Sequence, residues 1–267
     1  ALASARTGSD VDHASSHAGV EMLPSGHITG SRAALIHGEE EILYTGDVSL
    51  RDRQYLDGFE PVEADILVVE STYGVPAYSF PPQQEIENDI MSWLEEEEGP
   101  LLLFGYSLGK AQKIQKIVEE TVDRPLLAHS SVKEMNEVVE EATDLSFQAE
   151  LYGENREKLE NGILVAPSRL SNSDWADELV DEFGAVKAGF SGWAVQDSYR
   201  YRGGYDKTFP LSDHCGFEDL VKLVEEVDPE KVYTHHGFDE AFASYLKREK
   251  GIHARALKSN QSTLHDF

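Results

Sequence analysis

Short apolar runs that end at turn residues recur along the chain and alternate with amphipathic stretches. Residues 83–99 and 216–230 carry apolar side chains at three- and four-residue spacing, which predicts helices with one buried face. Gly99 supplies a stop signal for the first of them. Strands that alternate with helices predict an α/β fold with largely buried strands. The runs are EEILYTGD, ADILVVES, PLLLFGY, RPLLAHS, NGILVAPS, GAVKAGF and KVYTHHG, and the helical apolar positions are Ile86, Ile90, Trp93, Leu94, Phe217, Leu220, Val221 and Val224.

Two loops are the expected domain boundaries. YGVPAYSFPPQQ contains three prolines, and RYRGGYDKTF is polar and contains paired glycines. If both are boundaries, residues 75–205 form a domain inserted between residues 1–74 and 206–267, which together form another domain.

The chain is strongly acidic, with 50 Asp and Glu against 23 Lys and Arg and a net charge of −27. Each acidic run, such as LEEEEG, is typical of a solvated helix face. An excess spread over the whole chain indicates adaptation to strong salt, where the Debye length falls to about 3 Å at 1 M. The charge therefore does not exclude a nucleic-acid substrate.

The cysteine count and the hydropathy pattern exclude several classes of protein and of metal site. A single cysteine, Cys215, excludes an internal disulfide framework and a thiolate-rich zinc site, which leaves histidines and carboxylates as metal ligands. No apolar run approaches the roughly 20 residues that span a bilayer. The chain begins ALASARTGSD, without the basic flank and apolar core of a secretory signal, so we expect a cytoplasmic protein with no membrane partner.

Five acid or imidazole groups follow apolar runs or tight turns, or precede a helix. Singly, each also fits a structural role: a histidine at a strand end is often hydrogen-bonded scaffold, and an aspartate after glycine closes a turn. Because strand ends in an α/β fold converge on one edge of the sheet, where ligands bind, the five groups together predict a functional pocket. They are His27 in PSGHITGS, Asp47 in LYTGDVS, Glu70 in LVVESTYG, His214 in FPLSDHCGF and His236 in YTHHG.

The order of these motifs resembles the metallo-β-lactamase-fold nucleases of the β-CASP group. GHITGS is similar to the group's third metal motif, YTGD to its fourth, ESTYG to motif A, SDH to motif B and the HG of THHG to motif C. The long stretch between ESTYG and SDH matches the inserted β-CASP domain. FGYSLGKAQ, SGWAVQ and FPLSDH most resemble the ligase-associated DNA exonucleases and the archaeal mRNA 3′-end processing factors.

The resemblance implies a fold and a set of roles. The fold is a metallo-β-lactamase αββα sandwich with an inserted α/β domain, and the cofactor is a pair of zinc ions that activate water against a phosphodiester. By motif, His27 binds the first ion, Asp47 bridges both ions and His236 binds the second. His214 is implied as the general acid, with Glu70 holding its ring. His235 is left as scaffold or a supporting residue.

The family's strongest ligand motif, HxHxDH, has no counterpart in this sequence. Only 26 residues precede His27, and DVDHASSHAG has the wrong spacing, so His13 and His17 are interpreted as surface residues. We therefore expect an N-terminally incomplete lactamase domain with part of the ligand set. Metal occupancy and catalysis are not expected from this chain alone.

Ser107 and Lys110 are candidate substrate contacts in FGYSLGKAQ. A strand, a glycine turn and a helix N-terminus there predict free N–H groups that suit an anion. The stretch is not a Walker loop, because Gly105 and Gly109 are one residue too close and Ala111 replaces the required Ser or Thr. A capped helix that packs on the sheet is an equally good interpretation.

Ser191 and Arg200 are the other candidate substrate contacts. SGWAVQDSYRYRGG mixes arginines with Trp193, Tyr199 and Tyr201, which suits contact with a charged backbone and stacked bases. The same alternation is typical of an edge strand, and both interpretations stay open.

The function expected from the sequence is a zinc-dependent nuclease that acts on single-stranded RNA or DNA. One alternative is a β-CASP relative that binds nucleic acid or a partner without cutting it. A second is a small-ester or thioester hydrolase, which ESTYG, SDH and the large insertion disfavour. The choice between RNA and DNA, the native metal and the formation of a homodimer are left open.

Overall fold

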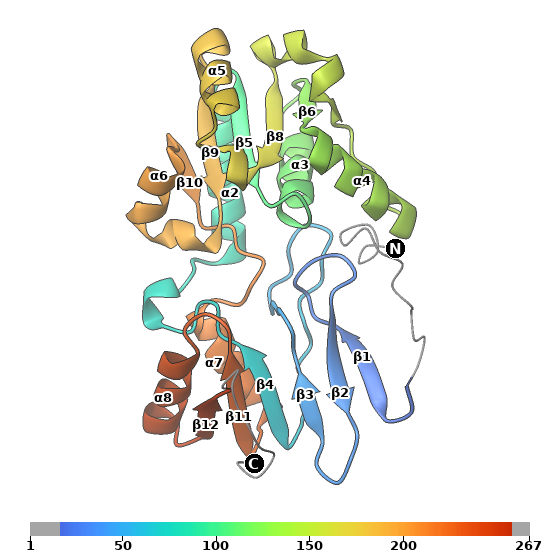
Figure 1. Ribbon diagram of the computed structural model, residues 1–267, viewed down its shortest axis with the longest axis vertical. Helices are drawn as coiled ribbons and strands as arrows, with labels where there is room; N and C mark the ends of the chain where they lie inside the picture. The colour runs from blue at the N-terminus through green and yellow to red at the C-terminus, as the bar shows by residue number, and fades with distance from the viewer. Residues whose placement is uncertain (1–16, 258–267) are drawn as a thin grey trace.

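The computed structural model describes residues 17–257, which form two six-stranded sheets with helices against them (Figure 1). In the first sheet, the first three strands pair antiparallel and the others parallel. Since two antiparallel steps restore the direction of the chain, β1 and β3 run the same way as β4, β11 and β12. The strand order is β1 (Val20–Pro24), β2 (Arg32–Ile36), β3 (Ile42–Tyr44), β4 (Ile66–Glu70), β11 (Lys231–His235) and β12 (His253–Ala256).

Helices α7 (Phe217–Val227) and α8 (Asp239–Glu249) pack on one face of the first sheet. The predicted apolar positions of α7 are buried there against Leu67, Val69 and other alternate strand residues. Each fully buried Leu, Val or Phe contributes about 1.5–3 kcal/mol. On the same sheet Met22, Ile36 and Tyr44 are exposed.

The second sheet is wholly parallel. Its central strands are buried along their whole length, as the continuous apolar runs PLLLF and GILVAP predict. Its order is β10 (Lys207–Phe209), β9 (Val186–Phe190), β5 (Leu101–Gly105), β8 (Ile163–Pro167), β6 (Leu126–Ala128) and β7 (Glu150–Leu151).

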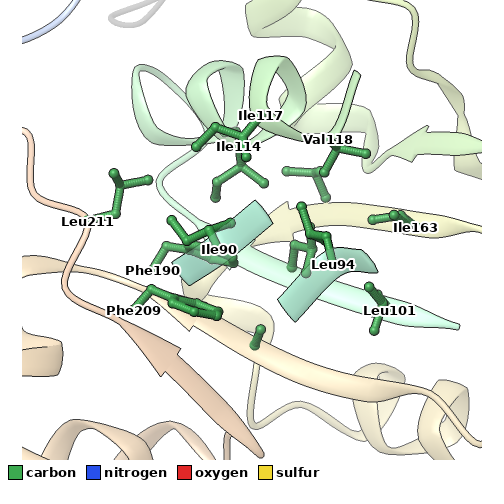
Figure 2. Close-up of a cluster of buried hydrophobic side chains, with 14 of the residues drawn as sticks. Ile90, Leu94, Leu101, Ile114, Ile117, Val118, Ile163, Phe190, Phe209 and Leu211 are labelled. Atoms are coloured by element: carbon green, nitrogen blue, oxygen red, sulfur yellow. The ribbon is translucent and has the colours of Figure 1, made fainter. Parts of the chain in front are cut away.

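Helices cover both faces of the second sheet. Alternate residues of each strand point to opposite sides, and in β5 and β8 both sets of residues are buried. Leu101 and Ile163 join one core with α2 and α3, which Figure 2 shows, whereas Leu102 and Leu164 join the core under α5. The helices are α2 (Gln83–Glu96), α3 (Lys110–Thr121), α4 (Ser130–Ala142), α5 (Asp174–Phe183) and α6 (Asp197–Gly203), with short 3-10 helices η1 (Pro76–Tyr78), η2 (Tyr152–Glu154), η3 (Arg156–Asn161), η4 (Ser168–Leu170) and η5 (Gly192–Val195).

The α/β prediction is confirmed, with the second sheet inserted between β4 and β11 of the first. β10 pairs with β9, which carries the second sheet to Phe209, past the expected boundary at residue 205. The edge-strand interpretation of SGWAVQDSYRYRGG is wrong, since this stretch forms η5 and α6. Within residues 17–257 no helix has the length and apolar character needed to cross a bilayer.

Candidate metal and active site

Five loops meet at one edge of the first sheet. His27 follows β1, Asp47 follows β3, Glu70 ends β4 and His236 follows β11, and these four strands share one direction. His214 arrives from the segment between β10 and α7. The shared direction of the four strands therefore brings the four groups at their ends to one edge of the sheet.

His27, Asp47 and His214 form a compact donor group. One ligand atom from each lies within 4.8 Å of the others. His27 Nε2 is 3.6 Å from Asp47 Oδ2, and the His27 and His214 ring centroids are 4.4 Å apart. Imidazole and carboxylate donors at this spacing suit zinc, which usually takes four ligands. The group therefore fits a zinc ion as part of a ligand set.

Hydrogen bonds fix the orientation of both histidines. His27 Nδ1 donates to the backbone carbonyl of Asp213 at 2.9 Å, and His214 Nδ1 donates to Glu70 Oε1 at 2.7 Å. Metal-binding and catalytic histidines commonly use one ring nitrogen in this way. The Nε2 atoms of His27 and His214 are left for a metal ion or for proton transfer.

The protonation of the site follows from its burial. Burial, followed by the neighbouring His214, lowers the pKa of His27 to about 3, so its ring is neutral and able to bind a metal at pH 7. Burial alone would raise the pKa of Glu70. The hydrogen bonds from His214, Thr72 and Val48 outweigh that effect and hold the pKa below its ordinary value. Glu70 is therefore an ionised partner for the His214 ring.

His236 lies outside this donor group. It follows the last residue of β11, has a left-handed φ of 59° and exposes its side chain. Its neighbour His235 stacks on Tyr44 with ring centroids 5.6 Å apart. Among the residues that the structure describes, His235 Nε2 has no hydrogen-bond partner although it is buried. Of the surface histidines expected from DVDHASSHAG, His17 is exposed, whereas His13 lies outside the described residues.

A buried charge cluster of Arg53, Lys110, Lys113 and Asp213 supports the donor group. Lys110 Nζ lies 2.9 Å from Asp213 Oδ2, Lys113 forms an ion pair with the same carboxylate, and Arg53 NH1 lies 3.9 Å from it. Arg53 also donates to the carbonyls of Ser212 and Gly26. The cluster thus connects α3, the His27 loop and the loop that carries His214.

A cavity of about 770 Å³ adjoins the donor group and lies between the two sheets. Its wall includes Ser107, Lys110 and Ser191, whereas Arg200 is not part of it. Arg200 lies in α6 and donates from Nε to the Tyr205 carbonyl.

The phosphate contact expected of Lys110 does not fit the structure. Its side chain is 2 % exposed, and its ammonium donates to the carbonyl of Leu211 and pairs with Asp213. Burial, followed by the charge of Arg53, holds the pKa of Lys110 well below its usual range. Lys110 is therefore an internal partner of the His214 loop.

Tyr106 and Arg169 are among the residues of the cavity wall that sequence reasoning missed. Both come directly after buried parallel strands, Tyr106 after β5 and Arg169 within η4 after β8. Their position at strand ends was the available signal.

A family model described as "Zn-dependent metallo-hydrolase RNA specificity domain" matches residues 207–257. A probable DNA ligase from Opitutus terrae is 35% identical over 253 residues, which cover 92% of this chain and 24% of the relative. A probable RNase MJ4 from Methanocaldococcus jannaschii is 25% identical over 85% of this chain and 63% of its own length. The chain thus spans less than two thirds of either relative.

A solved structure supports the fold. The crystal structure of a protein of unknown function from Enterococcus faecalis superimposes with a TM-score of 0.57, at 16% identity, over 90% of this chain and 62% of that one. At this identity the likeness concerns the fold alone.

Proposed function

Because the chain belongs to the metallo-β-lactamase-fold β-CASP nuclease family, we propose that it carries the site of a zinc-dependent nuclease that hydrolyses single-stranded RNA or DNA. The observation that most supports this proposal is that His27, Asp47 and His214 lie close together beside a cavity of about 770 Å³. That volume lies in the range of about 300–1,000 Å³ found for ligand pockets.

The residues divide into metal-binding and proton-transfer roles. His27 and Asp47 would hold zinc, and His236 remains the proposed ligand of a second ion. Bound zinc supplies Lewis-acid polarisation of the scissile phosphate and makes a water molecule nucleophilic at neutral pH. His214 donates a proton from Nε2 to the leaving oxygen, while the hydrogen bond from Nδ1 to Glu70 fixes the orientation of the ring. Ser107 and Ser191 contact the substrate from the cavity wall.

The proposed setting is a cytoplasm of high salt concentration, with RNA processing or DNA repair as the process. A net charge of −27 supports the first part of this proposal, since such a surface tolerates nucleic acid only where repulsion is screened.

The test is hydrolysis of labelled single-stranded RNA and DNA with Zn²⁺ or Mn²⁺ in molar KCl, by this chain and by the full product of its gene. We expect the full product to cleave, and His214→Ala to abolish cleavage while metal content stays unchanged. Full metal occupancy without cleavage of either substrate would refute the nuclease proposal. Loss of metal in His214→Ala would instead make His214 a ligand.

A second candidate is a protein that binds nucleic acid without cutting it. The size of the donor group favours this candidate. Within residues 17–257 the group has three members and does not include His236, whereas zinc usually takes four ligands. Zinc titration of the full gene product distinguishes the two: a product that binds single-stranded RNA but no zinc is a binding protein.

A further inference from the structure

Tyr106 is an exposed aromatic residue in a concave site. Its side chain is 60% exposed, and it lies on the cavity wall where β5 ends. In the part of the chain that the structure describes, no aromatic ring stacks on it. A tyrosine face left open inside a ligand-sized cavity is suited to stacking on a flat ligand, because every nucleobase offers a π face.

Arg169 is an exposed arginine on the same wall. Its guanidinium forms no hydrogen bond or ion pair with other described residues, in a chain whose net charge is −27. Lys110, the other cationic residue of the wall, is buried and already pairs with Asp213. Arg169 therefore supplies the cavity with an available positive charge, in a planar form that fits phosphate.

The two residues belong to neighbouring loops. β5 and β8 are adjacent and parallel, with Gly105 paired to Pro167, and η4 contacts β5. Adjacent strands lie about 4.7–4.9 Å apart, so residues that follow this pair emerge side by side at one edge of the sheet. His27, Asp47 and His214 line the same cavity from the first sheet.

We propose that Tyr106 and Arg169 form a nucleotide subsite beside the metal site, in which Tyr106 stacks on an unpaired base and Arg169 binds a phosphate of the same strand. This subsite rests on the proposed nuclease function and gives it a way to hold single strands. The stacking contact needs no particular base and excludes paired ones, which remain stacked in a duplex.

The subsite explains how so acidic a chain holds a polyanion. One phosphate contact to a single strand contributes about −0.7 to the slope of log K against log salt, so binding through Arg169 alone has a shallow salt dependence. The stacking on Tyr106 is not electrostatic and persists in strong salt.

The test uses the 267-residue chain and a short fluorescein-labelled single-stranded RNA in EDTA, with binding measured by anisotropy across a KCl series. We expect Tyr106→Ala to weaken binding by about tenfold or more at every salt concentration with an unchanged slope, and Tyr106→Phe to bind as the parent does. Arg169→Gln should reduce the magnitude of the slope by about 0.7. Matched controls are Tyr201→Ala and Arg202→Gln, both exposed on α6 and outside the cavity wall.

The proposal is overturned if the parent chain binds no single strand, if it binds the duplex equally well, if Tyr106→Ala resembles Tyr201→Ala, or if Arg169→Gln leaves the slope unchanged. Because EDTA removes metal, the result is independent of catalysis. Binding that depends on Tyr106 without cleavage by the full product with zinc would refute the nuclease and retain the subsite. If the full product cleaves and Tyr106→Ala cleaves equally well at low substrate concentration, the nuclease proposal is retained and the subsite is refuted.

Discussion

Glu70 shows how one buried side chain organises the site. Its carboxylate is fully buried and accepts hydrogen bonds from His214 Nδ1 and from the backbone N–H groups of Val48 and Thr72. An amide at this position would turn an NH₂ group toward one of these donors. Because an unmatched buried donor costs about 1–3 kcal/mol, we expect Glu70→Gln to lower the free energy of unfolding by that amount in urea titrations at pH 7.

The pH dependence of stability provides a control for this prediction. The folded-state pKa of Glu70 lies below its ordinary value, so its stabilising effect is complete above the unfolded-state pKa and is lost as pH falls through the folded-state pKa. Glu70→Gln should therefore lose less stability than the parent on acidification below pH 5. Glu85→Gln, an exposed change on α2, is the matched control. Parallel pH curves for Glu70→Gln and the parent would contradict the assignment.

At the scale of residues, sequence patterns carry least information where the backbone leaves regular structure. Alternation along a strand assigns His235 and His236 to opposite faces. However, β11 ends at His235, and His236 takes a left-handed φ of 59°. Its side-chain direction then depends on the Gly237 turn and the packing beneath it, which a two-residue period does not contain. The pairing of Glu70 with His214 came from motif order, because no local pattern relates positions 144 apart in the sequence.

At the scale of elements, ion pairs connect α3, which packs on the second sheet, to the loop between β10 and α7. Asp213 is the anion of the buried charge cluster, facing Lys110, Lys113 and Arg53. Removal of a buried ionic partner costs about 3–5 kcal/mol. We expect Asp213→Asn to destabilise the chain by that amount in urea unfolding. The double variant Asp213→Asn with Lys113→Met should recover part of the loss, and strict additivity of the two changes would show that the ion pair is not the cause.

The turn after β11 is fixed by a close approach to the end of β4. Gly237 has a φ of +65°, and a Cβ there would lie 2.4 Å from Thr72 Cα and 2.5 Å from the Ser71 carbonyl oxygen. We expect Gly237→Ala to lower the unfolding free energy by about 1–2 kcal/mol from its backbone conformation, with the clash adding to it. Gly99→Ala is the control, since a Cβ there meets nothing within 4 Å. Equal melting temperatures for the two variants would contradict the contact.

The sequence predicted buried elements better than exposed ones. PLLLF and GILVAP became β5 and β8 because continuous burial demands continuous apolar residues. SGWAVQDSYRYRGG was ambiguous because its aromatic residues are half-buried or exposed and its helix is short. Gly204, with a φ of 59°, ends that helix at a left-handed position. Glycine at such a position was the one local signal for a helix end.

For the whole molecule, the acidic surface is the property that most depends on solution conditions. Glu95, Glu96 and Glu98 are exposed at the carboxyl end of α2, where the helix dipole disfavours negative charge. Their mutual repulsion, and that among the other acidic residues of a chain whose net charge is −27, is screened as the Debye length falls from about 10 Å at 0.1 M to about 3 Å at 1 M. We therefore expect the melting temperature of the chain to rise as KCl increases from about 0.1 M to about 1 M.

A triple change tests the electrostatic origin of that rise. Replacing Glu95, Glu96 and Glu98 by glutamine removes three exposed charges that form no ion pairs within residues 17–257. We expect a gain of about 1 kcal/mol in unfolding free energy at low salt, because each unfavourable dipole interaction is worth a few tenths of a kcal/mol and more at low ionic strength. In molar KCl the gain should vanish, since screening already removes the repulsion. An equal gain at both salt concentrations would mean that helix propensity, and not charge, is responsible, and the salt dependence of the parent would then need another cause.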